Sequence, residues 1–369
     1  MEFGFSELQN ILVDSAKSFF KKEARGIVRE VEFSYEGYSP ELWRKMAELG
    51  WIGVVFPGEF GGIGGSFTDL VLILEEMGKT LFPGPFVPNI ISGLAILKYG
   101  SEAQKNEFLP KVMEGSFIIS PALTPPDPRL GEVVKDDRII VVDGGYVLSG
   151  TRLFVPYAHV ADFLVYRADT DEGTTLFLMD AKAPGITCTP LNSIGADKPC
   201  EVVLENVEIP KDRIIGESGD GEEIVDRIAE WGALAESARI VGMLERILKM
   251  SVEYAKEREQ FDKKIGSFQA IQHQAANMAM DVDQARFLTY EAAWKLSEGL
   301  PARKEISMAK AWASDAARRC SLLGVTIHGG AGVSEEHDMQ LYFRRAKAGE
   351  IAFGDGDFHR NIVAEELML

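Results

Sequence analysis

The sequence predicts an α+β protein in which a helical segment, a β segment and a second helical segment follow one another. Apolar residues recur at helical spacing through residues 1–116, in short alternating runs through residues 117–220, and again at helical spacing through residues 221–369. A chain of 369 residues also exceeds the usual size of one hydrophobic core. We therefore expect three domains with these limits: an N-terminal helical domain, a central β domain and a C-terminal helical bundle.

Local signals support each segment. In the first, the string SPELWRKMAELG has Ser39 and Pro40 as helix start signals and Gly50 as a stop signal. In the second, the strand-like runs RIIVV and YVLSG flank Asp-Gly-Gly at 143–145, which is a hairpin signal. In the third, the clearest apolar stripe predicts a helix that packs in an antiparallel bundle. Its residues are Ile306, Ala309, Ala313, Ala316, Cys320 and Leu323.

The composition argues against several classes of partner and site. A formal net charge of −18 repels nucleic acids and anionic membrane surfaces, so a polyanionic ligand such as a CoA thioester needs particular Lys and Arg side chains at its site. The 3 cysteines have no CxxC spacing and the 5 histidines form no HxxxH motif, so no metal site is predicted. No signal peptide is recognised, and no apolar run reaches the roughly 18 residues of a membrane span. We expect a soluble, cytoplasmic protein.

The glycine-rich run at residues 61–65, Gly-Gly-Ile-Gly-Gly, is expected to be a surface turn. A dinucleotide-binding loop needs a preceding apolar strand, glycines at GxGxxG spacing and an acidic residue further along a βαβ unit. Because this context is missing, the sequence does not predict a Rossmann-type site.

A second group of residues has the chemistry to bind phosphate. Arg258 and Phe261, in KEREQFDKKIGSFQAIQH, lie three residues apart at the end of a predicted helix and so point the same way. Gln269 follows, and Gly329 and Gly330 come later in the string HGGAG. Arginine is a bidentate partner for phosphate, and glycine lets the backbone approach it closely. Each signal alone is typical of an ordinary surface residue, and only their joint occurrence favours a binding site.

The chain resembles the acyl-CoA dehydrogenases over essentially its whole length. Four separated motifs carry the resemblance in the right order, together with the helical, β and helical sequence of segments. The motifs are LWRKMAELGWIGVVFPGEFGG, EREQFDKKIGSFQAIQH, TIHGGAGVSEEH and LYFRRAKAGEIAFGDGDFHRNIVAEEL. Within the family, the chain is most similar to the small or partner-type subunits of two-subunit dehydrogenases that act on dicarboxylyl, alicyclic or steroid-side-chain CoA esters.

This resemblance implies an N-terminal helical domain, a central β-barrel-like domain and a C-terminal four-helix bundle, assembled as a tetramer with FAD across a subunit interface. It implies that Arg258 and Phe261 contact the FAD of a neighbouring subunit, that Gln269 lies beside them, and that Gly329 and Gly330 receive the other end of the cofactor. The implied partners are an acyl-CoA substrate, a related dehydrogenase subunit or further copies of this chain, and an electron-transferring flavoprotein as acceptor.

In the β segment, the resemblance carries over Thr124 and Phe154 as flavin contacts. The string PALTPPD (121–127) stands where the family usually has a stretch that ends Thr-Glu-Pro-Gly, so Pro-Pro-Asp replaces the Glu-Pro-Gly turn. The string LFVP (153–156) stands where Met-Trp-Ile-Thr is common. Pro156 cannot donate the hydroxyl hydrogen bond that a threonine there gives the flavin.

The glutamate that serves the family as catalytic base is missing from both of its usual positions. Removal of the α-proton of an acyl-CoA needs a positioned carboxylate with a raised pKa. Aligning the RRAK motif places Phe353 at the usual base position, and Gly232 stands at the alternative position on an earlier helix. Glu236 lies one turn from Gly232 and is the candidate base, although a solvated or ion-paired surface glutamate is the competing interpretation. Asp355, where a cofactor-contacting hydroxyl is usual, and Asp357 are further candidates.

Several interpretations therefore stay open. The chain forms an active enzyme with a related subunit that bears the base, or it works alone with Glu236 or another carboxylate, or it is a non-catalytic subunit that completes the FAD site of a catalytic paralogue. A flavin monooxygenase or nitroalkane-oxidase-like activity on the same fold is a remote fourth. The sequence does not give the acyl group, because it does not fix the register of the helices that line the pocket.

Overall fold

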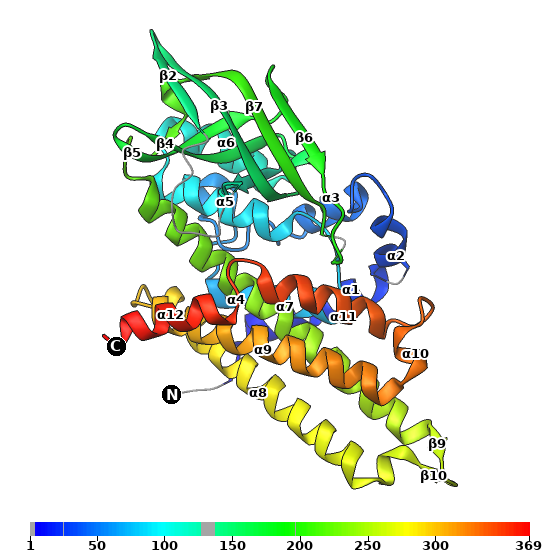
Figure 1. Cartoon of the computed structure of the whole chain (residues 1–369). Coiled ribbons are helices and arrows are strands. Elements are labelled where there is room, and N and C mark those ends of the chain that lie inside the picture. Colours follow the sequence, from blue (N-terminus) through cyan, green and yellow to red (C-terminus); the bar gives the residue numbers. More distant parts are fainter. Residues whose placement is uncertain (1–3, 25, 127–136, 196) are drawn as a thin grey trace. The chain divides into compact units, whose positions relative to one another are not determined.

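The computed structural model of the chain describes residues 4–24, 26–126, 137–195 and 197–369. Backbone contacts group the chain into two compact units, each assembled from segments that are far apart in the sequence. Unit 1 consists of residues 1–28, 66–82 and 233–369, and unit 2 consists of residues 29–65 and 83–232. The order of helices and strands along the chain confirms the predicted α+β class (Figure 1). The predicted domain limits at 116 and 220 remain a prediction.

Unit 2 contains the strands of the predicted β segment. In its described residues, two four-stranded sheets form, with the strand orders β1-β4-β5-β8 and β2-β3-β7-β6. The first sheet has one parallel pair, β1 with β4, and the second is antiparallel. The strands are β1 (Ile119–Ala122), β2 (Arg138–Val142), β3 (Gly145–Pro156), β4 (Phe163–Thr170), β5 (Gly173–Asp180), β6 (Ile186–Pro190), β7 (Pro199–Pro210) and β8 (Ile214–Ile215).

The local signals of unit 2 form the structures that the sequence predicts. Val142 pairs with Gly145, so residues 143 and 144 make the loop of a two-residue hairpin. The helix predicted after Ser39 begins with a hydrogen bond from the Leu42 N–H to the Ser39 hydroxyl (3.3 Å). In the run at 61–65, Gly61 is in a turn and residues 62–65 form an irregular, partly exposed loop that hydrogen-bonds to the backbone of residues 53–57. The helices of this unit are α3 (Pro40–Glu48), α5 (Phe86–Tyr99) and α6 (Glu102–Met113), together with α2 (Ile27–Glu32), which begins in unit 1 and enters unit 2 at Arg29.

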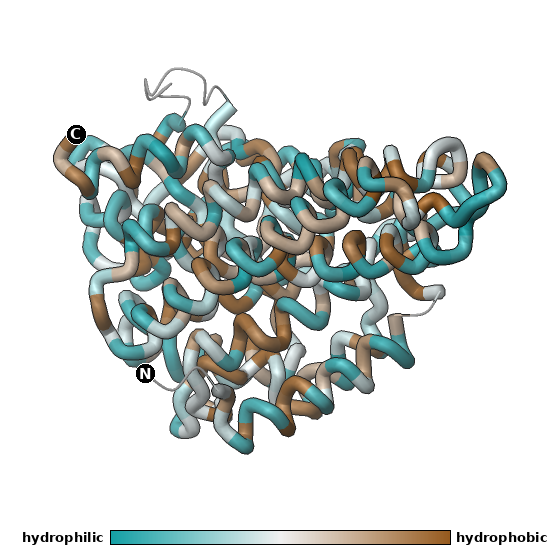
Figure 2. Tube along the Cα trace, turned by 90° about the horizontal axis from the view of Figure 1, so that it is seen from below, coloured by the Kyte–Doolittle hydropathy of each residue, from teal (hydrophilic) through white to brown (hydrophobic). Residues whose placement is uncertain are grey.

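Unit 1 is a bundle of helices, and Figure 2 shows hydrophobic and hydrophilic residues alternating along them. Of the predicted apolar stripe, Ile306, Ala309, Ala313, Ala316 and Cys320 on α9 are each 0% exposed. The helices are α1 (Glu7–Glu23), α4 (Phe67–Thr80), α7 (Gly221–Glu257), α8 (Gln269–Ser297), α9 (Arg303–His328), α10 (Gly330–Val333), α11 (Met339–Ile351) and α12 (Gly356–Glu366). Helix α7 begins in unit 2 and enters unit 1 at Ala233. No helix among the described residues is long and apolar enough to cross a membrane.

Two glycines let α4 and α7 approach each other closely inside unit 1. A Cβ atom on Gly242 of α7 would lie 1.9 Å from the Glu75 carbonyl oxygen. A Cβ atom on Gly78 of α4 would lie 2.0 Å from the Arg239 carbonyl oxygen. The backbones therefore touch where these helices cross, and any larger residue would force them apart.

Candidate functional site

One end of the bundle in unit 1 carries the residues that we expect to hold a cofactor. Arg258 follows the last turn of α7, and its N–H donates to the Tyr254 carbonyl oxygen (2.8 Å). Phe261 lies in the hairpin between β9 (Glu259–Gln260) and β10 (Lys263–Lys264), with 87% of its surface exposed. Phe261 and Asp262 have φ angles of 55° and 59°, which non-glycine residues adopt at a cost in energy. Such strain is concentrated at functional sites.

Aromatic rings connect the end of α7 to the glycine turn after α9. His328, the last residue of α9, stacks on Tyr254 with 4.5 Å between ring centroids. Gly329 follows with φ 59° and ψ −139°, a conformation that in practice requires glycine. A Cβ atom on Gly329 or Gly330 would meet none of the described atoms within 4 Å. The structure therefore brings the hairpin segment and an open stretch of glycine backbone to the same end of unit 1 (Figure 1).

Helix α8 begins beside the same hairpin. Gln269 is its first residue and is exposed, and Phe268 before it packs against Phe261 with 6.3 Å between ring centroids. Among the described residues, no side chain caps this helix start. Its free N–H groups and the positive end of the helix dipole favour an anion. Together with the guanidinium of Arg258 and the open glycine backbone, these groups suit a ligand that has phosphates at one end and an aromatic ring system at the other.

The candidate base Glu236 lies in the body of α7, four residues after the buried Gly232. Glu236 is 5% exposed, and its Oε2 pairs with Nη1 of Arg239 at 2.9 Å. Its Oε1 faces α11, because a Cβ atom on Gly349 would lie 2.7 Å from it. The carboxylate is therefore buried and ion-paired, and it lies against the helix that leads to Phe353.

Phe353 lies in the turn between α11 and α12. Its φ of 55° is in the left-handed region, and Gly354 follows with φ 97°. Two buried side chains contact the carbonyl groups of this turn. Nε2 of His359 lies 2.9 Å from the Phe353 oxygen, and Nζ of Lys310 lies 2.9 Å from the Gly354 oxygen. The turn is thus held from two helices, while the side chain that it presents cannot accept a proton.

Lys310, on α9, is 0% exposed and also binds the end of α11. Its Nζ donates to the carbonyl oxygens of Gly349 (3.1 Å) and Glu350 (3.0 Å) and to the Ser314 hydroxyl (2.8 Å). Burial lowers the pKa of Lys310 to about 8, although nearby carboxylates act in the opposite direction. Those carboxylates belong to Glu236, Asp355 and Glu350.

His359, on α12, is the second buried residue behind the turn. It is 3% exposed, and its Nδ1 lies 3.2 Å from the Ser307 hydroxyl of α9. Burial lowers its pKa to about 4, against the opposing effect of its contact with the Phe353 oxygen. The ring is therefore neutral at physiological pH. Nε2 must then carry the proton, because the Phe353 carbonyl can only accept a hydrogen bond.

No role was predicted from the sequence for Lys310 or His359. For Lys310 a signal was present, since it lies four residues after Ile306 and three before Ala313, on the apolar stripe of α9. A lysine inside a buried stripe needs partners, and the sequence shows the need without showing the partners. His359 has no comparable signal, because nothing near it in the chain indicates burial.

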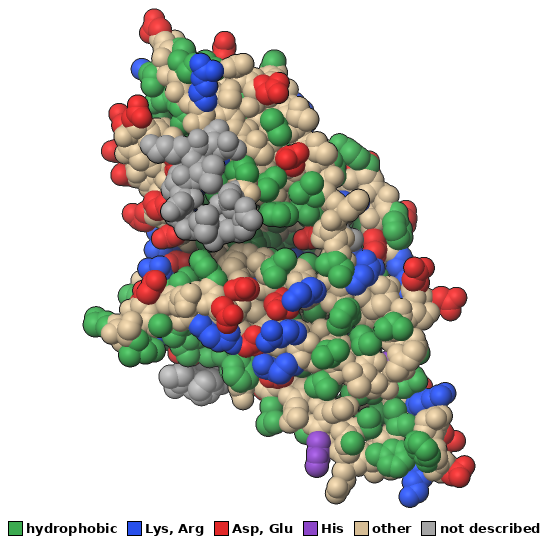
Figure 3. All heavy atoms as spheres, in the orientation of Figure 1, with side chains coloured by type: hydrophobic (Ala, Val, Ile, Leu, Met, Phe, Trp, Pro, Cys, Tyr) green, Lys and Arg blue, Asp and Glu red, His purple; other side chains and the backbone are tan. Residues whose placement is uncertain are grey.

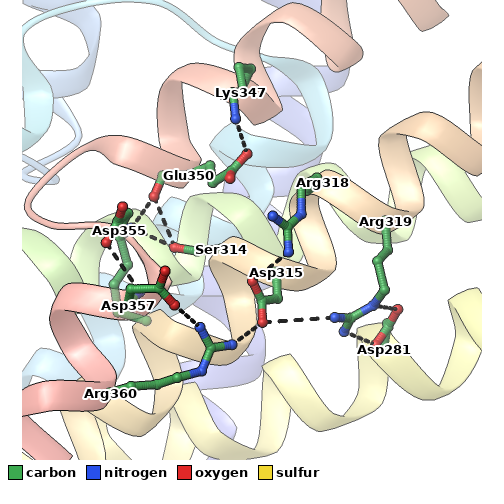
Figure 4. A network of polar contacts seen from close by, with 11 residues as sticks. Asp281, Ser314, Asp315, Arg318, Arg319, Lys347, Glu350, Asp355, Asp357 and Arg360 are labelled. Atoms are coloured by element: carbon green, nitrogen blue, oxygen red, sulfur yellow. Dashed lines mark hydrogen bonds and ion pairs between the residues drawn. The ribbon is translucent and has the colours of Figure 1, made fainter.

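Asp355 caps α12. Its carboxylate accepts hydrogen bonds from the N–H groups of Asp357 (3.1 Å) and Phe358 (2.9 Å). Asp357 in turn pairs with Arg360 (2.7 Å), which also contacts Asp315 of α9 (Figure 4). The capping contacts account for Asp355 structurally, and its role at a cofactor remains a prediction. Figure 3 shows acidic and basic side chains intermixed on this face of unit 1, so the face carries no concentrated charge of one sign.

Thr124 and Phe154 are neighbours in unit 2. The Thr124 carbonyl oxygen accepts a hydrogen bond from the Leu153 N–H (2.9 Å). Phe154 is 59% exposed and has a φ of 57°, where the β3–β7 register shifts in a bulge. Bulges of this kind redirect a side chain out of the sheet. Asp127, at the end of the string PALTPPD, lies outside the described residues.

Comparisons with known proteins agree on one family. Family models of the acyl-CoA dehydrogenase N-terminal and C-terminal domains match residues 6–116 and 219–368. A glutaryl-CoA dehydrogenase from Desulfococcus multivorans is 32% identical over 382 residues, which cover 99% of this chain and 97% of that protein. The ChsE4–ChsE5 complex from Mycobacterium tuberculosis has a TM-score of 0.92 at 29% identity, over 100% of this chain and 99% of that one. PigA with FAD and proline has a TM-score of 0.92 at 27% identity, over 100% of both chains.

Proposed function

Because this chain belongs to the acyl-CoA dehydrogenase family, we propose that it is one subunit of a heteromeric dehydrogenase for CoA thioesters with dicarboxylyl, alicyclic or other bulky acyl groups. By family, it is an FAD-dependent acyl-CoA oxidoreductase. The proposal depends on a contrast within unit 1 between cofactor-contacting residues that are present and a catalytic base that is missing. The bundle end keeps Arg258 and the 87% exposed Phe261, whereas the turn that bears the base in the family presents Phe353.

The residues at the bundle end suit FAD. The guanidinium of Arg258, the free start of α8 at Gln269 and the open backbone at Gly329 and Gly330 would hold its diphosphate. Phe261 would pack against a ring of the cofactor. When bound, FAD supplies the acceptor for the hydride that leaves the β-carbon of the acyl group. The family resemblance gives Phe261 this role toward the FAD of a neighbouring subunit, and its exposed position at the tip of the hairpin is compatible with that.

The base is the part that this chain lacks at the usual positions. A related subunit with glutamate at the equivalent turn would supply it, and the likeness of this chain to a chain of the ChsE4–ChsE5 complex supports assembly with a second subunit. If the chain turns over alone, we propose Glu236 as its base, because it is a buried carboxylate one helical turn from Gly232. In that case Glu236→Gln abolishes turnover while FAD content is kept, and unchanged turnover would exclude Glu236.

A non-catalytic role is the second candidate, and the same contrast favours it. In this case the chain completes the FAD site of a catalytic paralogue and performs no proton transfer itself. Steady-state assays of mixed tetramers separate this role from turnover on Glu236, because inactivating the partner's own base removes all activity unless this chain has a working base of its own. As acceptor for the reduced flavin, we propose an electron-transferring flavoprotein, as the family resemblance implies.

The decisive experiment is co-expression with a related dehydrogenase chain that has a glutamate at the position of Phe353, followed by native mass measurement and flavin counting. Two flavins per mixed tetramer would support the heteromer, and a fully active homotetramer with four flavins would refute it. Arg258→Ala should lower FAD occupancy at least severalfold, because a charge-assisted contact contributes roughly 1.5–3 kcal/mol. Lys263→Ala, on the same hairpin, is the control for a general loss of charge. A colourless protein, alone and in the mixture, would contradict the FAD assignment.

A further inference from the structure

Helix α8 has a stripe of large apolar side chains that stays exposed in unit 1. Met280, Phe287 and Trp294 are 56%, 65% and 48% exposed, and each follows the one before it by seven residues. Side chains at this spacing lie on one face of a helix. Figure 1 shows α8 at the edge of the bundle, beside α9. The stripe extends along about 21 Å of helix, which is long enough for a second helix to pack against it.

Acidic side chains lie beside this stripe. Asp283 comes four residues before Phe287, and Glu291 comes four residues after it, so both lie along the same face of the helix. The side chain of Asp283 is 67% exposed, and Glu291 is exposed as well. Glu298 follows at the end of α8 and is also exposed. The apolar stripe is therefore flanked by carboxylates that are accessible to a partner.

The two long cationic side chains of α8 are bound to residues outside this helix. Nη2 of Arg286 lies 2.5 Å from Oε2 of Glu245 on α7, whereas the closest guanidinium nitrogen to the Asp283 carboxylate is 3.8 Å away. Nζ of Lys295 lies 2.6 Å from Oε1 of Glu305 on α9. Because these cations are held by other carboxylates, they leave the flanks of the stripe acidic.

A second copy of this chain is a poor partner for this face. In antiparallel packing across a two-fold axis, residues equally far from the centre face each other. With Phe287 at the centre, Asp283 faces Glu291 of the other copy. A centre between Met280 and Phe287 brings the two Asp283 side chains together. A centre between Phe287 and Trp294 brings the two Glu291 side chains together. Each of these registers buries the stripe against itself and places like charges next to each other, which repel.

We propose that the exposed face of α8 binds a helix of the related dehydrogenase subunit, and that this helix has an apolar stripe flanked by lysine or arginine. The inference rests on the proposed function, because it gives the second subunit of the heteromer a place on this chain. Basic side chains four residues before and after a central apolar residue would face Asp283 and Glu291 in antiparallel packing. The charge pattern then favours the related subunit and disfavours a second copy.

The first test needs only this chain. Glu291→Arg makes the face complementary to itself, because the introduced cation faces Asp283 of the other copy. In sedimentation velocity of the full chain with FAD added, this variant should self-associate at a concentration at least about tenfold lower than the wild type. Adding Phe287→Lys should remove the gain, because it places a charge at the centre of the stripe. Asp14→Arg reverses a charge at an exposed position of α1 and is the matched control, with association as in the wild type.

The second test uses a related dehydrogenase chain that has glutamate at the position of Phe353 and a basic residue at the position of Glu291. Phe287→Lys in this chain should lower the fraction of mixed oligomer in native mass spectra by at least about fivefold. Because Phe287 is 65% exposed, thermal unfolding of this chain should not change. Replacing the basic residue of the related chain with glutamate should weaken the mixed oligomer, and Glu291→Arg in this chain should restore it.

The inference is overturned if Phe287→Lys leaves the mixed oligomer unchanged. The proposed heteromer then stands, because the two chains associate through another face. It is also overturned if the wild-type chain self-associates and Phe287→Lys disperses that assembly, because a second copy is then the occupant of the face. If no mixed oligomer forms at all, the proposed heteromer itself is wrong and this inference is wrong with it.

Discussion

Replacing His359 with glutamine should reduce the fall in the free energy of unfolding that the protein shows as the pH is lowered. In the folded protein, burial lowers the pKa of His359 to about 4, whereas the unfolded chain has the ordinary value of 6.5. Between these values the unfolded state binds more protons, so the free energy of unfolding falls as the pH falls from about 6.5 to 4. Glutamine does not titrate, so the variant lacks this contribution.

The magnitude follows from the difference between the two pKa values. A difference of about 2.5 units at 1.36 kcal/mol each gives a limit of about 3.4 kcal/mol below pH 4. Between about pH 7.5 and pH 5, roughly 2 kcal/mol of it is lost. At neutral pH the variant should be less stable than wild type by about 1 kcal/mol, because it loses the ring's contacts with Phe353 and Ser307. The difference between the two proteins should therefore shrink or reverse as the pH falls.

The measurement is urea unfolding of the flavin-loaded protein at stepwise pH values, for wild type, His359→Gln and His273→Gln. His273 is exposed on α8, so its replacement should leave the loss of unfolding free energy at acidic pH as it is in the wild type. Parallel stability curves for wild type and His359→Gln would refute the reasoning. A ring pKa for His359 near 6.5 by nitrogen-15 NMR would refute it directly, because it would show that burial does not disfavour the charged ring.

Three further predictions concern packing, capping and thiol reactivity. Gly242→Ala should destabilise the protein by about 2 kcal/mol or more in thermal or urea unfolding, because the added Cβ would lie 1.9 Å from the Glu75 carbonyl oxygen. Gly58→Ala is the control and should be nearly neutral, because no described atom lies within 4 Å of its Cβ. Asp355→Ala should lower the free energy of unfolding by about 1 kcal/mol, because the variant loses the side-chain cap of α12. Asp355→Asn should retain most of that stability. A variant that loses FAD without losing stability would instead support a cofactor role for Asp355. Burial raises the pKa of Cys320 to about 12. Its alkylation by iodoacetamide should therefore be at least about a hundredfold slower in the folded protein than in the unfolded chain. Fast labelling of the folded protein would contradict the burial.

The sequence by itself determined the elements whose signals are local. The α3 start at Ser39, the hairpin at residues 143–144 and the buried face of α9 depend on neighbours a few residues away, which periodicity and turn chemistry report directly. The four motifs were likewise sufficient to predict the family, and with it FAD and the acyl-CoA class of substrate. The absence of a glutamate at position 353 is also a fact of the sequence alone.

Only the tertiary structure decided how distant segments combine. It assigned α1 and α4 to the same unit as the C-terminal helices, although the pattern along the chain had grouped them with the other N-terminal helices. It also brought Lys310 to the Gly354 carbonyl and His359 to the Phe353 carbonyl, and it showed Glu236 to be buried and paired with Arg239. These contacts depend on how α7, α9, α11 and α12 pack. Packing is set by the shapes of side chains on several helices at once, so no local pattern in the sequence encodes it.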